Sequence, residues 1–148
     1  MIASYIGFKF VHVLVAIIAL GTGAALGILL AFFAGHPTHG AFVLRTVRTL
    51  LYCVVIPGYV LMLITGMWTA HLGALLDARW AEAAMNLWGV GAICIALTAV
   101  GVHRQIASLD SVGSSSLAYR RAALLWKLSG MAAGIVILAM IYLMVFKP

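Results

Sequence analysis

Long apolar runs alternate with short polar stretches along this chain. Four runs, at about residues 5–34, 46–70, 83–102 and 122–146, are each twenty or more residues long and predominantly apolar. Crossing a hydrocarbon core about 30 Å thick takes about 20 helical residues, and a helix satisfies its own backbone polar groups in lipid. The pattern therefore predicts four transmembrane helices.

The connections between these runs are short. Residues 35–45 contain Gly-His-Pro-Thr-His-Gly, which is typical of a turn, and residues 103–121 contain Gly-Ser-Ser-Ser, which indicates a flexible loop. The remaining connection covers residues 71–82. Short links join neighbouring antiparallel helices. We therefore expect an all-α fold, an integral membrane antiparallel four-helix bundle that forms one domain over residues 1–148.

Composition agrees with a membrane location. Hydrophobic residues make up 66% of the chain and charged residues 8%, with a mean hydropathy of +1.19, whereas a soluble domain is about one quarter charged. The net charge of +6 comes from basic residues at the ends of the apolar runs, without a basic cluster that contains interleaved aromatics. This pattern predicts a lipid bilayer as partner and argues against nucleic-acid binding.

The basic residues are unevenly divided between the two predicted membrane faces. Three lie on the side of the termini and the second connection (Lys9, Arg79 and Lys147), and six lie on the other side (Arg45, Arg48, Arg104, Arg120, Arg121 and Lys127). Cytoplasmic loops carry the excess of Lys and Arg. We therefore expect a multi-pass protein of the bacterial inner membrane with both termini in the periplasm.

His12 is the main candidate for chemistry. It lies in the first apolar run, and its helical face continues through small residues, at Ala16, Ala19, Gly23 and Gly27. Such a stripe lets helices approach closely, so His12 is expected to point at neighbouring helices, where an ionisable residue is a functional-site hypothesis by default. The imidazole is suited to bind haem iron, to bind another metal or to hydrogen-bond a quinone. The alternative is a packed histidine bonded to a neighbouring group.

Two further residues on the same side extend this hypothesis. Lys9 is one helical turn from His12, where it either neutralises a haem propionate or extends to the lipid headgroups. His71 ends the second apolar run, either as a second axial ligand or as an interfacial histidine. No carboxylate lies deep in a predicted span, which argues against a proton relay of the kind found in pumps.

A second group of histidines lies on the opposite side. His36 and His39 form a His-x-x-His pair around Pro37, and His103 follows the third apolar run. Imidazoles are usual ligands of copper and zinc, so these three form a candidate metal site, with turn and interface residues as the alternative. Met62, Met67 and His71 form another candidate set for copper.

Several short motifs resemble a bacterial superfamily of four-helix membrane proteins. Phe8-Lys9-Phe10-Val11-His12 is similar to the Lys-x-x-His opening of that group, and Ile56-Pro57-Gly58 with Thr65-Gly66-Met67-Trp68 is similar to its second helix. The group includes HemJ-type protoporphyrinogen oxidases, the CopD membrane domain and a set labelled predicted integral membrane protein. The chain lacks the HemJ-type lysine early in the third helix and the glutamate that opens the last helix. It is therefore most similar to the uncharacterised set.

For HemJ-like members the resemblance implies b-type haem with the first-helix histidine as a ligand, which by position is His12. We therefore expect a haem b-binding protein with an electron-transfer or accessory oxidoreductase role. It would act alone, as a homo-oligomer, or in a larger membrane complex with a cytochrome or quinone as redox partner. The alternatives are a cofactor-free scaffold or assembly subunit, and a copper-handling membrane protein.

Overall fold

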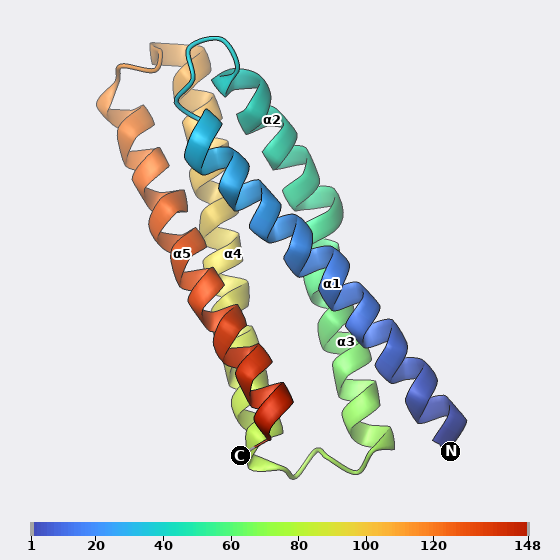
Figure 1. The fold of residues 1–148 in the computed structure, drawn as a ribbon. Coiled ribbons are helices and arrows are strands. Elements are labelled where there is room, and N and C mark those ends of the chain that lie inside the picture. Colours follow the sequence, from blue (N-terminus) through green and yellow to red (C-terminus); the bar gives the residue numbers. More distant parts are fainter. Residues whose placement is uncertain (1, 148) are drawn as a thin grey trace.

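The computed structural model describes residues 2–147 and consists of long helices joined by short turns (Figure 1). Four helical stretches are long and apolar enough to span a membrane. They comprise α1 (Ile2–Phe33), α2 (Gly40–Leu50) continued by a π-helical segment (Leu51–Val55) and α3 (Ile56–Leu72), α4 (Arg79–Val112), and α5 (Leu117–Phe146). Both termini and the α3–α4 connection lie at one end of the bundle (Figure 1). The predicted all-α, antiparallel four-helix membrane bundle is confirmed.

The helices are longer than the apolar runs that predicted them. The expected flexible connection at 103–121 is wrong over most of its length, because α4 continues to Val112 and α5 begins at Leu117. Ser116 ends the short turn by accepting a hydrogen bond from the Tyr119 backbone N–H at 3.2 Å. The polar residues of 103–112 therefore belong to a helix that extends beyond the apolar segment.

Pro57 lies within the second span. Proline has no backbone N–H, so the carbonyl four residues before it, that of Cys53, loses its α-helical partner. The structure accommodates this with the π-helical segment Leu51–Val55, after which the Ile56 N–H bonds to the carbonyl of Leu51, five residues earlier. A π-turn is a common source of helix bending. The span therefore continues through the proline without breaking.

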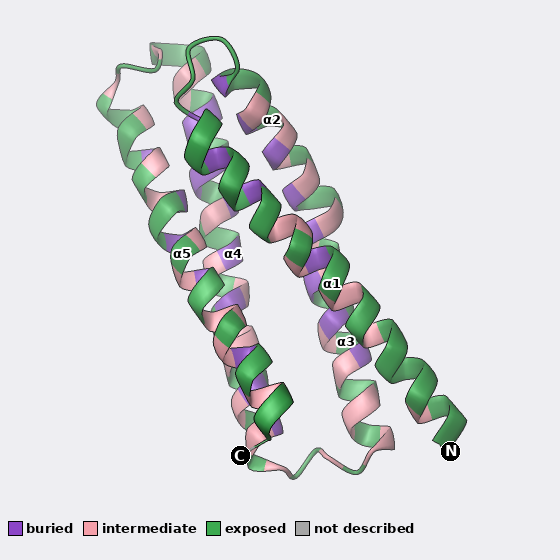
Figure 2. Cartoon of the chain, in the orientation of Figure 1, coloured by how far each residue is buried: buried purple, intermediate pink, exposed green. Residues whose placement is uncertain are grey.

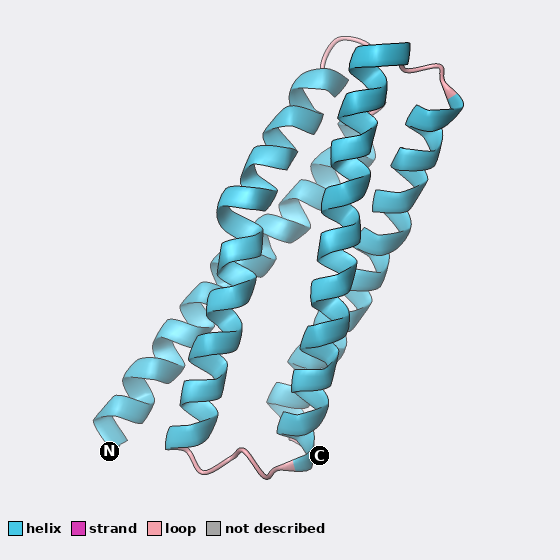
Figure 3. Ribbon diagram, turned by 180° about the vertical axis from the view of Figure 1, so that it is seen from behind, coloured by secondary structure: helices cyan, strands magenta, loops and turns pink. Residues whose placement is uncertain are grey.

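The helices pack as two pairs, α1 with α3 and α4 with α5 (Figures 1 and 3). Glycine permits the closest approaches. A Cβ atom added at Gly58 would lie 2.7 Å from Ala19 Cβ, and one at Gly101 would lie 2.8 Å from the Trp126 backbone nitrogen. By contrast, Gly27 and Gly134 face open space with no atom within 4 Å. The small-residue stripe thus contacts α3 at Ala19, while Gly27, at the end of that stripe, and Gly134 on α5 form no such contact within residues 2–147.

Burial differs between the two ends of the bundle. We call the end with the turns at 34–39 and 113–116 the closed end, and the end with both termini and the turn at 73–78 the open end. The four largest fully buried side chains, Leu44, Val47, Val102 and Gln105, all lie toward the closed end. No residue of α1 before Ala19 is buried in the described part of the helix (Figure 2). The most completely buried part of the core therefore lies toward the closed end, while the same apolar cluster continues through Met62 and Met140 to the open end.

Polar groups inside the closed half are hydrogen-bonded. Trp126 Nε1 donates to Gln105 Oε1 at 2.7 Å, and the hydroxyls of Thr98 and Ser129 lie 2.9 Å apart. Tyr119 Oη donates to the Ala34 carbonyl at 2.9 Å, which ties α5 to the end of α1. Leaving such a group unpaired in a dry interior costs about 1–3 kcal/mol. These bonds therefore favour the observed packing of α5 against α4 and against the end of α1.

Candidate functional site

A half-enclosed cavity of about 270 Å³ lies at the open end. Its lining comes from α1, α3, α4 and α5 and from the turn at 73–78, so it lies where the two helix pairs face each other. Most of the lining is apolar or aromatic, and the polar side chains include those of Tyr5, Lys9, His12 and Lys147. A mainly apolar cavity with a few convergent polar groups is the usual form of a small-molecule site.

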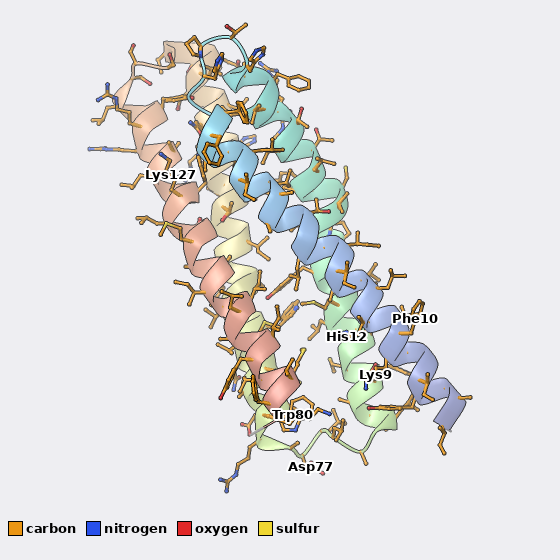
Figure 4. The ribbon with its side chains drawn as sticks, viewed as in Figure 1. Lys9, Phe10, His12, Asp77, Trp80 and Lys127 are labelled. Atoms are coloured by element: carbon orange, nitrogen blue, oxygen red, sulfur yellow. The ribbon has the colours of Figure 1, made fainter. Side chains whose placement is uncertain are left out.

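His12 lines this cavity as a half-buried side chain on α1. It points toward α3, whereas Phe10, two residues earlier, points away from the bundle (Figure 4). Its Nδ1 lies 3.1 Å from Thr65 Oγ1 on α3. The expected inward orientation therefore agrees with the structure.

The hydrogen bonds of Thr65 indicate which imidazole nitrogen carries the proton. Thr65 Oγ1 lies 2.7 Å from the Leu61 carbonyl, which can only accept, so the threonine hydroxyl donates there. The same oxygen then accepts from His12 Nδ1–H, and Nε2 keeps its lone pair. Nε2 is not engaged by this hydroxyl, and it lies 3.6 Å from where a Cβ atom on Gly66 would be. From this network we infer an imidazole held at Nδ1, with Nε2 as the nitrogen left for a ligand.

Gly66 provides the space for the ring. A Cβ atom added there would lie 2.9 Å from His12 Cε1 and 3.3 Å from Nδ1. The Thr65-Gly66 pair therefore orients the histidine in two ways. The Thr65 hydroxyl oxygen accepts a hydrogen bond from the ring, and Gly66, which has no side chain, lets the ring lie against the α3 backbone. In the sequence, this pair is part of the Thr65-Gly66-Met67-Trp68 motif, which by itself indicates no role for either residue.

Tyr59 and Trp88 form an aromatic pair beside the cavity, and Trp88 is part of the lining. The rings of Tyr59 and Trp88 stack with centroids 5.1 Å apart. Tyr59 Oη donates to the Trp88 carbonyl at 3.1 Å, and Trp88 Nε1 donates to the Tyr59 carbonyl at 3.2 Å. Gly91 leaves room for the Tyr59 hydroxyl. These reciprocal bonds join α3 to α4 beside the cavity.

Two lysines give the cavity its charge. Lys9 Nζ lies 5.9 Å from the ring centroid of Tyr5, and Lys147 Nζ lies 5.5 Å from that of Trp80 (Figure 4 labels Lys9 and Trp80). No Asp or Glu is among the lining residues of the described chain. A ligand with an apolar body and an anionic edge therefore complements this lining.

Five methionines also line the cavity: Met62, Met67, Met85, Met140 and Met144. Thioethers are polarizable and adapt to irregular ligands. Sequence reasoning had noted Met62 and Met67 but missed Met85, Met140, Met144 and Lys147. These lie on α4, on α5 and just after it, far from His12 in sequence, so no local pattern could link them to His12.

The other candidate residues lie elsewhere. His71 is exposed and outside the cavity lining, with its ring centroid 6.5 Å from that of Trp68, which in turn packs 5.9 Å from Phe8. The rings of His36 and His39 stack at 4.9 Å at the closed end. No group of three or more His, Cys, Asp and Glu side chains suited to a metal forms within residues 2–147. The structure therefore does not bring His103 together with the His36–His39 pair.

Comparison with known proteins gives one match. A family model described as "Predicted integral membrane protein (DUF2269)" matches residues 7–148. No curated protein and no solved structure matches the chain. Because the match covers nearly all of the sequence, including the helices that build the cavity, this chain belongs to that family of predicted integral membrane proteins.

Proposed function

We propose that this membrane protein binds haem b in the cavity at its open end and serves an electron-transfer or accessory oxidoreductase role. It would act on its own or as a subunit of a larger membrane complex. The observation that carries the proposal is His12, whose Nδ1 is held by Thr65 and whose side chain is part of the cavity lining. An imidazole oriented in this way by a second hydrogen bond is the usual arrangement of a metal-ligating histidine.

The lining fits the chemistry of haem. Haem has a planar apolar body and two propionates. The cavity offers aromatic and aliphatic walls with Lys9 and Lys147, and none of its lining residues within 2–147 is an Asp or Glu. The cavity, at about 270 Å³, is at the small end of ligand sites. It is half-enclosed, so a larger ligand would extend beyond the enclosed volume toward the bilayer. Haem would supply one-electron chemistry, while His12 would hold the iron and the lysines would hold the propionates.

A methionine of the lining would be better placed than His71 to hold the iron together with His12. His71 lies outside the lining, whereas Met62, Met67 and Met144 are part of it. Thioether sulfur serves with histidine as a haem ligand in cytochromes. The electron partner would be a cytochrome or a quinol, as expected for a one-electron cofactor in a membrane.

Copper handling is a second candidate at the same cavity. Soft thioether ligands favour Cu(I), and imidazole also suits copper. The five methionines around His12 support this candidate better than the histidines at the closed end do.

We further propose the bacterial inner membrane as the location, with the open end facing the periplasm. The support is the distribution of Lys and Arg, three at the open end and six toward the closed end. The His12 cavity would then exchange electrons on the periplasmic side.

The test is pigment content in protein purified after expression with a supply of haem precursor. Wild-type protein and the His71→Ala variant should carry haem, whereas His12→Ala should be colourless while eluting as a folded protein. Haem in the His12→Ala variant at the wild-type level would overturn the assignment. A colourless wild type that retains copper would favour the second candidate, and one with neither would favour a cofactor-free scaffold.

A further inference from the structure

A second, separate groove lies on the outer surface of α5 at the closed end. It has a volume of about 340 Å³ and is lined by Ser114, Tyr119, Arg120, Ala123, Leu124 and Lys127. It begins at the turn at 113–116 and follows the first turns of α5. Figure 4 labels Lys127 on this part of the helix. None of its lining residues borders the His12 cavity.

The groove carries two cations without an acidic partner. Arg120 and Lys127 are seven residues apart on α5, so they lie on the same face about 10 Å apart along the axis. The single ion pair in residues 2–147 joins Arg45 to Asp110 at 2.8 Å. Asp110 is already engaged by Arg45, and the other two carboxylate side chains, Asp77 and Glu82, lie at the open end. Within the described chain, the groove is therefore free of acidic side chains and suited to an external anion.

The position of Lys127 indicates that this anion is at the membrane surface. Lys127 lies ten residues after the start of α5, about 15 Å along the helix, and is exposed. The exposed residues around it on α5 are apolar, with Leu124 at 56%, Leu128 at 59% and Met131 at 68% exposure. A lysine beside lipid extends its ammonium group toward the headgroups. Lys127 Nζ lies 5.7 Å from the ring centroid of Trp126, and Arg120 is on the same face of α5, two turns nearer the helix start.

The start of α5 adds to the positive field. Ser116 accepts the Tyr119 N–H, while the other first-turn N–H groups of a helix lack partners within it. Together with the helix dipole, they favour a negative group beside the Ser114 hydroxyl. The groove thus has two cations and the N-terminus of α5 on the side of the closed end, and an apolar face of α5 on the side of the membrane interior.

We propose that this groove binds the phosphate headgroup of an anionic phospholipid, with the acyl chains lying along Leu124, Leu128 and Met131. Arg120 contacts the phosphate from the headgroup level, and Lys127 reaches it from below. The site is independent of the ligand in the His12 cavity.

The test compares lipid binding by delipidated protein in detergent. Native mass spectrometry would measure binding of phosphatidylglycerol and phosphatidylcholine by wild type, by the Arg120→Gln/Lys127→Gln double variant and by Arg104→Gln. Arg104 is an exposed arginine of α4 outside the groove and serves as the matched control. The wild type and control should prefer phosphatidylglycerol. The double variant should bind it roughly 30-fold more weakly, because each cation near an anionic lipid surface contributes a factor of about five.

Two results would overturn the proposal. One is equal phosphatidylglycerol binding by the wild type and the double variant. The other is displacement of the bound lipid by millimolar inorganic phosphate in the wild type, which would assign the groove to a soluble phosphate. The conservative variant Lys127→Arg should keep wild-type binding, and melting curves of all variants would show that they remain folded.

Discussion

The two ends of the bundle use the same helices differently. At the closed end, Leu44 and Val102 have no exposed surface, Gln105 is satisfied by Trp126, and α2 contributes apolar side chains to the core. At the open end, the described part of α1 before Ala19 has no buried residue, and a cavity of about 270 Å³ separates the helix pairs. The closed end therefore holds the fold together, which leaves the open end free to keep a partly polar cavity around His12.

The comparison also explains why the cavity contains an ordered histidine. Thr65 and Gly66 fix the ring from α3, and the Tyr59–Trp88 pair joins α3 to α4 below it. At the open end, the two helix pairs are thus loosely packed against each other, whereas α1 and α3 contact each other closely around His12. A preorganised side chain next to free volume is what a ligand site requires.

The largest stability effect is expected for Leu44→Ala at the closed end. Leu44 is fully buried, so truncation leaves a cavity and should lower the free energy of unfolding by about 2–5 kcal/mol. Met144→Ala, which enlarges the existing cavity at the open end, should cost far less. Thermal melts of both variants in the same detergent measure the difference, and equal losses would remove the distinction between the two ends.

Gly101→Ala should destabilise the bundle by about 1–3 kcal/mol, as overpacking does in a tight core. The new methyl group would lie 2.8 Å from the Trp126 backbone nitrogen, so α4 and α5 must separate. Gly134→Ala is the matched control on α5, because its Cβ would meet no atom within 4 Å. Melting temperatures check the pair. A tolerated Gly101→Ala would show that the closed end is less tightly packed than the structure indicates.

Thr65→Val should weaken ligand binding at the open end by about 10–100-fold, as loss of a group that orients a metal ligand does. Valine keeps the shape of the threonine side chain but removes the oxygen that accepts a hydrogen bond from His12 Nδ1–H. Thr69→Val is the control, since the Thr69 side chain lines the cavity but its hydroxyl bonds only to the Thr65 carbonyl. Haem titration measures both affinities, and equal affinities for the two variants would contradict the role of Thr65.

The smallest effect is expected for Arg45→Ala. Arg45 and Asp110 are about half exposed, at 54% and 51%, and such pairs contribute about 0–1 kcal/mol. The melting temperature of Arg45→Ala should differ little from that of the wild type. High salt should likewise leave the wild-type melting temperature almost unchanged. A loss as large as that from Leu44→Ala would show that charge pairing rather than packing holds the closed end.

Much of this fold follows from the sequence because its signals are local. The apolar runs identify the spans, and the stripe from His12 through Ala19 correctly predicts the face that meets α3. The helix ends were less predictable. Residues 103–112 are polar because they extend beyond the expected apolar span, which composition alone cannot distinguish from a loop.

The cavity depends on contacts that sequence periodicity does not encode. Periodicity gives the face of a helix but not its neighbour, which is why Gly27 and Gly134 resemble packing residues yet face open space. His12 and Lys9 were found because they are polar residues in an apolar run. Lys147 and Met140 reach the cavity only after the chain has returned through α5.

The central claim, that His12 binds haem iron in the open-end cavity, is tested most directly by an absorption spectrum. Detergent-purified wild-type protein, expressed with haem available, would be measured oxidised and after reduction with dithionite. If His12 binds haem b, the spectra contain a Soret band and sharp reduced bands of the b type. A flat visible spectrum in both states would contradict the claim.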